Sequence, residues 1–167
     1  MSIQALKDYI EENKRVWSSP IHGINHWEHV WSNGQEVGWA VDADLEVVEY
    51  FAYLHDCQRL SEGTDWLHGP RAAQFAQQNR ELFDLSGTQF KELISAVAGH
   101  TKLQPGCKAG ENPTIATCWD ADRLDIWRQP GSSAGNLHTA ATVDCFLGDD
   151  CAARHISKRR PAWLSRI

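Results

Sequence analysis

Apolar residues recur at intervals of three and four along most of the chain, with short polar breaks between the recurring stretches. Such intervals place side chains on one face of an α-helix, whereas a half-buried strand needs apolar and polar positions to alternate. No stretch of the sequence sustains that alternation. The pattern therefore predicts an all-α fold, a compact bundle of several helices.

Three helices are predicted in the first third of the chain, over residues of about 2–17, 25–41 and 45–58. The Ser18-Ser19-Pro20 segment ends the first, because proline disrupts a helix interior. Asp42 and Asp44 precede the third, where an aspartate side chain can accept hydrogen bonds from free N–H groups of the first turn. The third helix carries the most apolar run of the chain.

Four more helices are predicted, beginning at about residues 68, 87, 114 and 137. Pro70 lies in the first turn of the helix that begins at His68, where its missing N–H costs least. Ser86 and Gln89 have the spacing of a capping box. The stretches 61–66, 102–113 and 129–135 are predicted to be loops.

The length favours one domain over residues 1–167, with a core of about residues 20–128 and a C-terminal helical extension at 136–167. The N-terminus lacks the apolar core of a signal peptide, and no apolar run approaches the length that spans a membrane. Five cysteines without a CxxC pair favour free thiols in the cytoplasm. A net charge of −6 argues against nucleic acid as a partner.

Histidines and aspartates stand on inward-facing positions and at the ends of the predicted helices. His55 and Asp56 follow the most apolar helix, and burying this pair without a partner or a metal is costly. His26 shares a helix face with apolar residues, His100 ends its own helix, and Asp122 lies on another. Imidazole and carboxylate ligands that converge from several helices suit Mn, Fe, Co, Ni or Zn.

The order His26…His55-Asp56…Asp122 resembles the H…HD…D signature of the HD-domain superfamily of metal-dependent phosphohydrolases. The segment His-Trp-Glu-His-Val that begins at His26 is similar to the family's HxxRV segment, with His29 where Arg is usual. Ala-Asp-Arg-Leu around Asp122 is similar to the family's ADRL segment. The resemblance covers roughly residues 20–128 and implies an all-α bundle with a divalent transition metal.

His68 and His100 extend the resemblance to the six-ligand H…HD…H…H…D pattern of two-metal members. In those proteins the aspartate of the HD pair, here Asp56, bridges two ions. The six expected ligands are therefore His26, His55, Asp56, His68, His100 and Asp122. With a single ion, His68 and His100 instead become hydrogen-bonding or phosphate-contacting residues.

The resemblance implies hydrolysis of a small phosphorylated substrate, a phosphomonoester or a nucleotide-like molecule, by metal-activated water. Asp56 is the expected catalytic ligand. Arg59 and Arg71 are candidate cations for the phosphate, with a surface ion pair as the alternative for Arg71. Arg59 stands where deoxynucleotidase-like members have the glutamate of HDxxE, and no Gly-Tyr-Pro signature occurs, which indicates a different, small bacterial branch.

Two other readings of the same residues stay open. Some six-ligand HD proteins are di-iron oxygenases that cleave C–C or C–P bonds, and a metal-stabilised binding domain without catalysis is a third possibility. His22 is interpreted as a hydrogen-bonding residue beyond the ligands, with contact to the substrate as the alternative. His29 is expected to face elsewhere, and His138 and His155 are expected to be unrelated to the site. The sequence makes no prediction of oligomeric state.

Overall fold

The computed structural model describes residues 3–13, 15–101 and 112–126. Within these ranges every regular element is a helix and no strand occurs, which confirms the all-α prediction. The α-helices are α1 (Ile3–Asn13), α2 (Ile24–Val41), α3 (Leu45–Leu54), α4 (His68–Gln78), α5 (Gly87–Gly99) and α6 (Pro113–Ile126), with two short 3-10 helices, η1 (Arg15–Ser18) and η2 (Arg80–Leu82).

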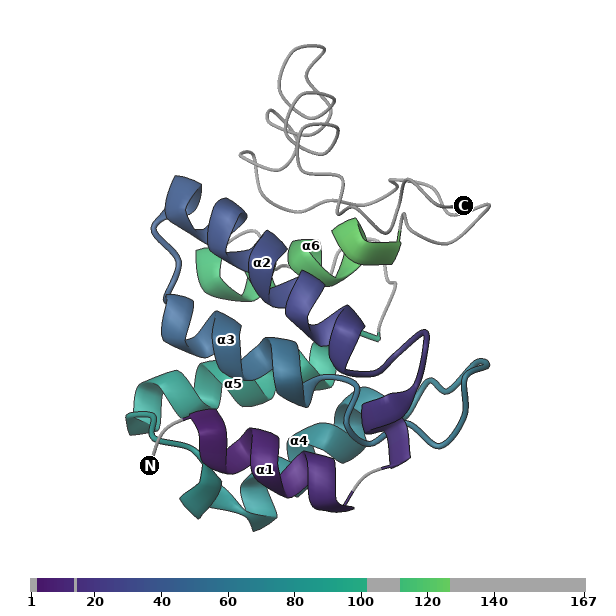
Figure 1. Cartoon of the computed structure of the whole chain (residues 1–167). Coiled ribbons are helices and arrows are strands. Elements are labelled where there is room, and N and C mark those ends of the chain that lie inside the picture. Colours follow the sequence, from purple (N-terminus) through teal and green to yellow (C-terminus); the bar gives the residue numbers. More distant parts are fainter. Residues whose placement is uncertain (1–2, 14, 102–111, 127–167) are drawn as a thin grey trace.

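Helix α3 lies in the middle of the bundle (Figure 1). It packs against α1, α2, α5 and α6, so most of its faces meet another helix. An apolar helix surface on nearly all sides is what such a central position requires. The buried residues of α3 are Val47, Val48, Tyr50, Phe51, Ala52, Tyr53 and Leu54.

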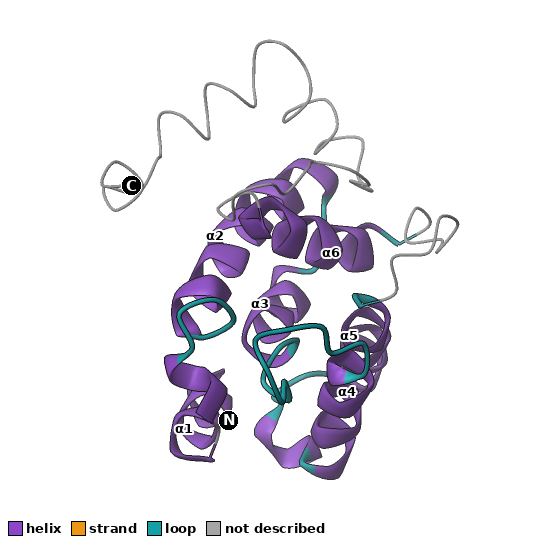
Figure 2. Ribbon diagram, turned by 90° about the vertical axis from the view of Figure 1, so that its right-hand side faces the viewer, coloured by secondary structure: helices purple, strands orange, loops and turns teal. Residues whose placement is uncertain are grey.

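Two helix pairs flank α3. Helix α2 packs on α6, and α4 packs on α5 (Figure 2). At Gly34 a Cβ atom would lie 2.5 Å from Val48 Cγ1, so glycine at this position lets α2 approach α3 closely. The close approach brings the chemistry-bearing positions of the two helices near each other.

Hydrogen bonds tie the N-terminal ends of three helices together. Asp44 caps α3 by accepting from the N–H groups of Glu46 and Val47. The Asp44 N–H donates to Thr114 Oγ1 at the start of α6 (3.0 Å), and Gln89 Nε2 donates to Asp44 Oδ2 near the start of α5 (3.0 Å). Helices α3 and α5 therefore begin at one end of the bundle and both end at the other.

Some boundaries differ from the predicted ones. The first helix ends at Asn13 and is followed by η1, where the sequence predicted one helix to residue 17. Helix α3 ends at Leu54, not near Gln58, and turns at 55–58 follow it; in them the Cys57 N–H donates to Leu54 and the Arg59 N–H to Asp56. The capping box at Ser86 is present. The predicted helix at 137–147 and most of the loop at 102–113 lie outside the described residues.

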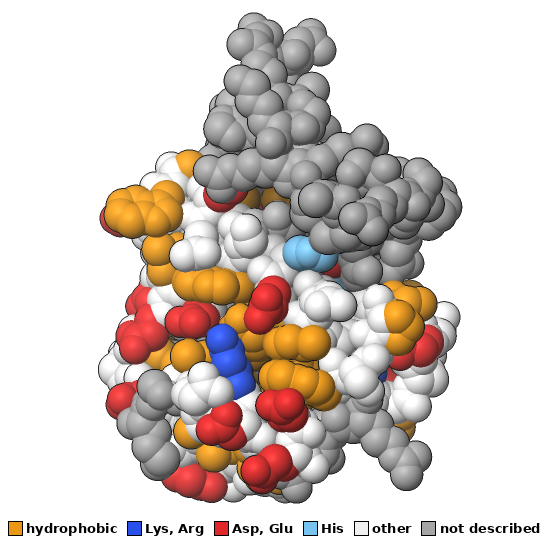
Figure 3. All heavy atoms as spheres, viewed as in Figure 1, with side chains coloured by type: hydrophobic (Ala, Val, Ile, Leu, Met, Phe, Trp, Pro, Cys, Tyr) orange, Lys and Arg blue, Asp and Glu red, His pale blue; other side chains and the backbone are white. Residues whose placement is uncertain are grey.

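In the part of the chain that the structure describes, no helix combines the length and the apolar character that crossing a membrane requires. The face shown in Figure 3 carries many acidic side chains and few basic ones. Its acidic character follows from the negative net charge of the sequence.

Candidate metal centre

The C-terminal end of α3 carries a buried histidine–aspartate pair. His55 is fully buried and caps the helix, and Asp56 is 3% exposed. The His55 ring stacks on Phe51, with ring centroids 5.0 Å apart. A carboxylate this deeply buried needs positive charge or hydrogen-bond donors around it. Each of its two oxygens faces a different set of histidines.

We call the set around Asp56 Oδ2 the first half-site; it comprises His26, His55, Asp56 and Asp122. The His26 and His55 Nε2 atoms are 3.1 Å apart, and each lies 3.7 Å from Asp56 Oδ2. Asp122 Oδ1 lies 3.3 Å from His26 Nε2 and 3.6 Å from His55 Nε2. Residues from α2, the end of α3 and α6 thus meet in one place.

The second half-site comprises Asp56, His68 and His100 and is centred on Asp56 Oδ1. The His68 and His100 Nε2 atoms are 2.8 Å apart, and they lie 2.9 Å and 3.8 Å from Asp56 Oδ1. His68 is the first residue of α4, and His100 caps the end of α5. All six residues predicted as ligands are therefore brought together.

The spacing of these atoms suits a transition-metal ion. Bonds of about 2.1 Å give ligand–ligand distances of about 3.4 Å in a tetrahedron and about 3.0 Å in an octahedron. The measured distances within both half-sites run from 2.8 to 3.8 Å. Asp56 offers one oxygen to each half-site, which is the arrangement of a carboxylate that bridges two ions.

The other ring nitrogen of each histidine has an acceptor. His26 Nδ1 lies 2.5 Å from Asp125 Oδ2, and His55 Nδ1 lies 3.0 Å from the Ala52 carbonyl. His68 Nδ1 lies 2.5 Å from the Asp65 carbonyl oxygen, and His100 Nδ1 lies 2.7 Å from the Val97 carbonyl oxygen. Since a neutral imidazole has one N–H, donation from Nδ1 leaves each Nε2 as a bare lone pair.

The Nε2 atoms consequently face each other in two pairs, His26 with His55 and His68 with His100. Two lone pairs at this distance repel, so each pair needs a cation next to it. A proton can serve one pair, but the surrounding carboxylates and imidazoles form the donor set of a divalent transition metal. The residues present therefore fit such an ion in both half-sites.

Charges in the first half-site favour a cation strongly. Burial lowers the pKa of His26, but the carboxylates of Asp122 and Asp125 outweigh burial and raise it to about 10. Burial lowers the pKa of His55 to about 4. Burial raises the pKa of Asp122, but His26 and His55 more than compensate and bring it to about 2. Without a metal, a proton on His26 balances the carboxylates.

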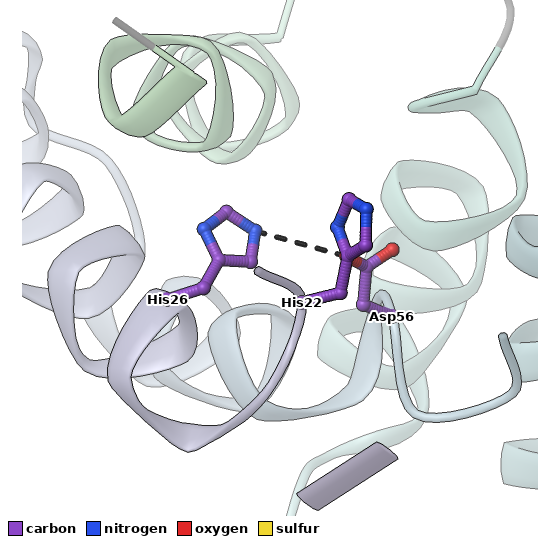
Figure 4. A group of neighbouring side chains, drawn as sticks. All are labelled: His22, His26 and Asp56. Atoms are coloured by element: carbon purple, nitrogen blue, oxygen red, sulfur yellow. Dashed lines mark ion pairs between the residues drawn. The ribbon is translucent and has the colours of Figure 1, made fainter. Parts of the chain in front are cut away.

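His22 lies closer to the centre than the sequence suggested. Its Nδ1 atom is 3.1 Å from Asp56 Oδ2, and Figure 4 shows His22 and His26 converging on that carboxylate. These three residues form a further group whose ligand atoms can share an ion. The preceding loop holds His22, because its backbone N–H donates to Ser19 Oγ and Gly23 has no room for a Cβ atom. Only loop packing fixes this placement, so periodicity gave no signal for it.

Asp125 and His29 also belong to the surroundings of the site. Asp125 Oδ2 contacts His26 and its Oδ1 lies 3.0 Å from His29 Nδ1, so the expectation that His29 faces elsewhere is wrong. Asp125 follows Asp122 by three residues on α6, which places both on one helix face. That spacing was the available signal, but the match to the ADRL segment selected Asp122 alone.

The two candidate phosphate-binding arginines have different surroundings. Arg59 Nη1 lies 3.5 Å from Asp56 Oδ1 and 3.4 Å from His68 Nε2, directly beside the second half-site. Arg71 instead pairs with Asp65 at 2.5 Å and donates to the Gln58 carbonyl. The ion-pair alternative for Arg71 thus matches its position, which holds the 58–67 loop against α4.

Close packing sets the distance between the two histidines of the second half-site. A Cβ atom at Gly69 would lie 2.6 Å from the Val97 carbonyl oxygen and 3.0 Å from the His100 ring. Glycine at this position therefore lets the start of α4 touch the end of α5. His68, next to Gly69, reaches His100 because of that contact.

Comparisons with known proteins agree with this architecture. No protein-family model matches the sequence, and no curated protein matches it. The fold is similar to the crystal structure of a predicted HD superfamily hydrolase from an uncultured Thermotogales bacterium. That protein is 25% identical, with a TM-score of 0.56, and the similarity covers 74% of this chain and 67% of that one.

Fold and site together define an all-helical protein with a buried histidine–aspartate centre that can hold metal. The structural similarity to the Thermotogales protein supports the resemblance of the chain to the HD-domain superfamily.

Proposed function

We propose that the protein is a metal-dependent phosphohydrolase that acts on a phosphomonoester or a nucleotide-like small molecule. One observation carries the proposal: four histidines direct their Nε2 atoms in two facing pairs toward the two oxygens of one buried aspartate. The structural similarity to a predicted hydrolase of the same superfamily supports it.

Bound ions would supply an activated water near neutral pH and polarise a phosphoryl oxygen. The protein's own residues supply the positioning. Asp56 holds the two half-sites in register, and Asp125 and backbone carbonyls orient the histidine rings. Of the described cations, Arg59 lies beside Asp56 and is 10% exposed, so it is placed to contact a phosphoryl oxygen.

The reaction breaks one phosphorus–oxygen bond. Water attacks phosphorus, the ester oxygen leaves with a proton that derives from the water, and inorganic phosphate and an alcohol result. Arg71 takes an indirect part in this scheme, because its ion pair with Asp65 braces the loop that carries Arg59. The substrate is expected to be small, as the sequence predicts.

The test combines metal analysis with phosphate release. Protein purified without added metal is analysed for its elements, reloaded with Mn²⁺, Co²⁺, Zn²⁺, Ni²⁺ or Fe²⁺, and assayed for inorganic phosphate released from sugar phosphates and nucleotides. We expect turnover that chelation abolishes and that Asp56→Asn lacks. Fully loaded protein that releases no phosphate from any of these substrates contradicts the proposal.

A second candidate, a di-iron oxygenase, is favoured by the six-ligand set around a carboxylate placed to bridge two ions. Iron content and oxygen consumption separate the two candidates. Two irons per chain, with oxygen consumed and no phosphate released, would replace the hydrolase proposal. Phosphate release with Mn²⁺ or Co²⁺ in the absence of oxygen would eliminate the oxygenase.

A further inference from the structure

We propose that the two half-sites bind metal unequally: the first holds its ion tightly by itself, whereas Arg59 keeps the second weak until an anionic phosphate arrives. This inference deepens the proposed function, on which it rests, because it concerns the same metal centre. It follows from the charges and donors that surround the two oxygens of Asp56.

The first half-site is rich in negative charge. Asp122 and Asp56 contribute carboxylate oxygens to it directly. Asp125 does not face the half-site itself but contacts Nδ1 of His26. It is also rich in donors, because His22 Nδ1 lies 3.1 Å from the same Asp56 oxygen. A divalent ion there is surrounded by opposite charge. Two overlapping sets of potential ligands, His26 with His55 and Asp122 and His22 with His26 and Asp56, lie around it.

The second half-site has neither advantage. Among the residues that the structure describes, its one carboxylate is the shared Asp56, and its other donors are the imidazole rings of His68 and His100. Arg59 adds a permanent positive charge there, since a guanidinium does not lose its proton in proteins. Its Nη1 atom is 3.4 Å from His68 Nε2 and 3.5 Å from Asp56 Oδ1, two of the three atoms that would hold the ion.

The guanidinium is held in this place by the loop that follows it. Arg59 Nη2 donates to the Gly63 carbonyl at 2.8 Å, and Nε donates to the Ser61 carbonyl at 3.4 Å. The side chain is only 10% exposed, so solvent screens its charge weakly. A divalent ion entering the second half-site therefore meets a fixed like charge at short range.

An anionic phosphate changes this balance. A phosphate oxygen that pairs with Arg59 offsets the positive charge and can serve as an additional ligand for the second ion. Binding of the second ion and binding of phosphate then strengthen each other by the same factor, as linkage requires. The metal centre would be completed when the substrate's phosphate arrives.

The experiment titrates metal-depleted protein with Mn²⁺ and measures free Mn²⁺ by electron paramagnetic resonance, with and without millimolar inorganic phosphate. Four variants accompany the wild type. Arg59→Gln removes the charge, and Arg59→Lys keeps a charge without the planar fork. Lys91→Gln removes one exposed positive charge on α5 and serves as the control, and His68→Ala assigns the weaker step to the second half-site. Circular dichroism and thermal melting verify that each variant folds.

We expect two binding steps, the second at least about tenfold weaker than the first. Arg59→Gln should reduce the ratio of the two dissociation constants by about tenfold, whereas Arg59→Lys and Lys91→Gln should largely preserve it. Phosphate should tighten the second step about fivefold or more in the wild type and much less in Arg59→Gln.

Two equal Mn²⁺ dissociation constants in the wild type would overturn the inference, as would a ratio of the two constants that Arg59→Gln leaves unchanged. Either result would leave the metal-dependent function standing. A protein that binds no ion from the metal panel would instead overturn the proposed function itself.

Discussion

The two half-sites share Asp56 but are built from different parts of helices. In the first, His26 lies in the first turn of α2 and Asp122 lies well inside α6, on helices that pack against each other and against α3. In the second, His68 and His100 stand at helix ends, beside the loop that carries Arg59. Packing among α2, α3 and α6 thus fixes the first half-site, whereas the contact between α4 and α5 and the loop that carries Arg59 fix the second.

Removing the shared carboxylate should abolish the difference between the half-sites by disabling both. Asp56→Ala is expected to lose most bound metal and to lower any phosphatase activity at least about a thousandfold, because both ions lose a ligand. Elemental analysis and phosphate release measure this. Metal retained at the wild-type stoichiometry would show that Asp56 is not the bridging ligand.

Removing one histidine ring from the second half-site should abolish metal binding there and leave the first half-site loaded. In protein saturated with Mn²⁺, His68→Ala is expected to reduce the bound metal from about two ions per chain to about one. His55→Ala is the matched variant in the first half-site and should remove the tighter ion. An unchanged metal content in His68→Ala would indicate a centre with a single ion.

A substitution at Asp125 tests whether the orientation of the His26 ring affects metal affinity in the first half-site and not in the second. Asp125→Asn removes the charge that holds the His26 ring, and loss of such a partner weakens metal binding by about 10-fold to 100-fold. The first Mn²⁺ dissociation constant should rise by that factor, while the second changes little. Equal weakening of both steps would show that the half-sites are coupled through more than Asp56.

The pH dependence of stability sharpens the contrast between metal-free and metal-loaded protein. Folding raises the pKa of His26 from 6.5 to about 10, so metal-free folded protein holds a proton that unfolded protein loses above pH 6.5. The stabilisation is complete below pH 6.5 and is lost as the pH rises through about 10. Between pH 6.5 and 8.5 the melting temperature of metal-free protein should fall by roughly 5–10 °C. Differential scanning calorimetry should show a flatter profile after metal loading, because an ion replaces the proton on His26.

Local signals in the sequence accounted for most of the described helices, and the resemblance to the motifs of two-metal HD proteins selected the six candidate ligands. The capping box at Ser86, the cap at Asp44 and the helix start at His68 depend on neighbouring residues, so they could be predicted. The end of α3 at Leu54 could not, because Gln58, Arg59 and Leu60 are good helix formers and no glycine or proline follows before Gly63. That the six residues are metal ligands remains a prediction.

The contacts that distinguish the half-sites were beyond the sequence for the same reason. His22 reaches Asp56 through a loop fitted against Ser19, and Arg59 reaches His68 because carbonyls of its own loop hold it. Neither contact has a periodic signature. The sequence showed an arginine in place of the usual glutamate, but only the fold showed which half-site it adjoins.

The way the four histidine rings are held has a consequence for how the centre tolerates mutation. Three rings donate to backbone carbonyls, which every amino acid supplies, so substitution at the accepting residue cannot remove the acceptor. His26 alone depends on a side chain, that of Asp125. Substitution can therefore remove the acceptor of one ring only, that of His26, and it does so at residue 125.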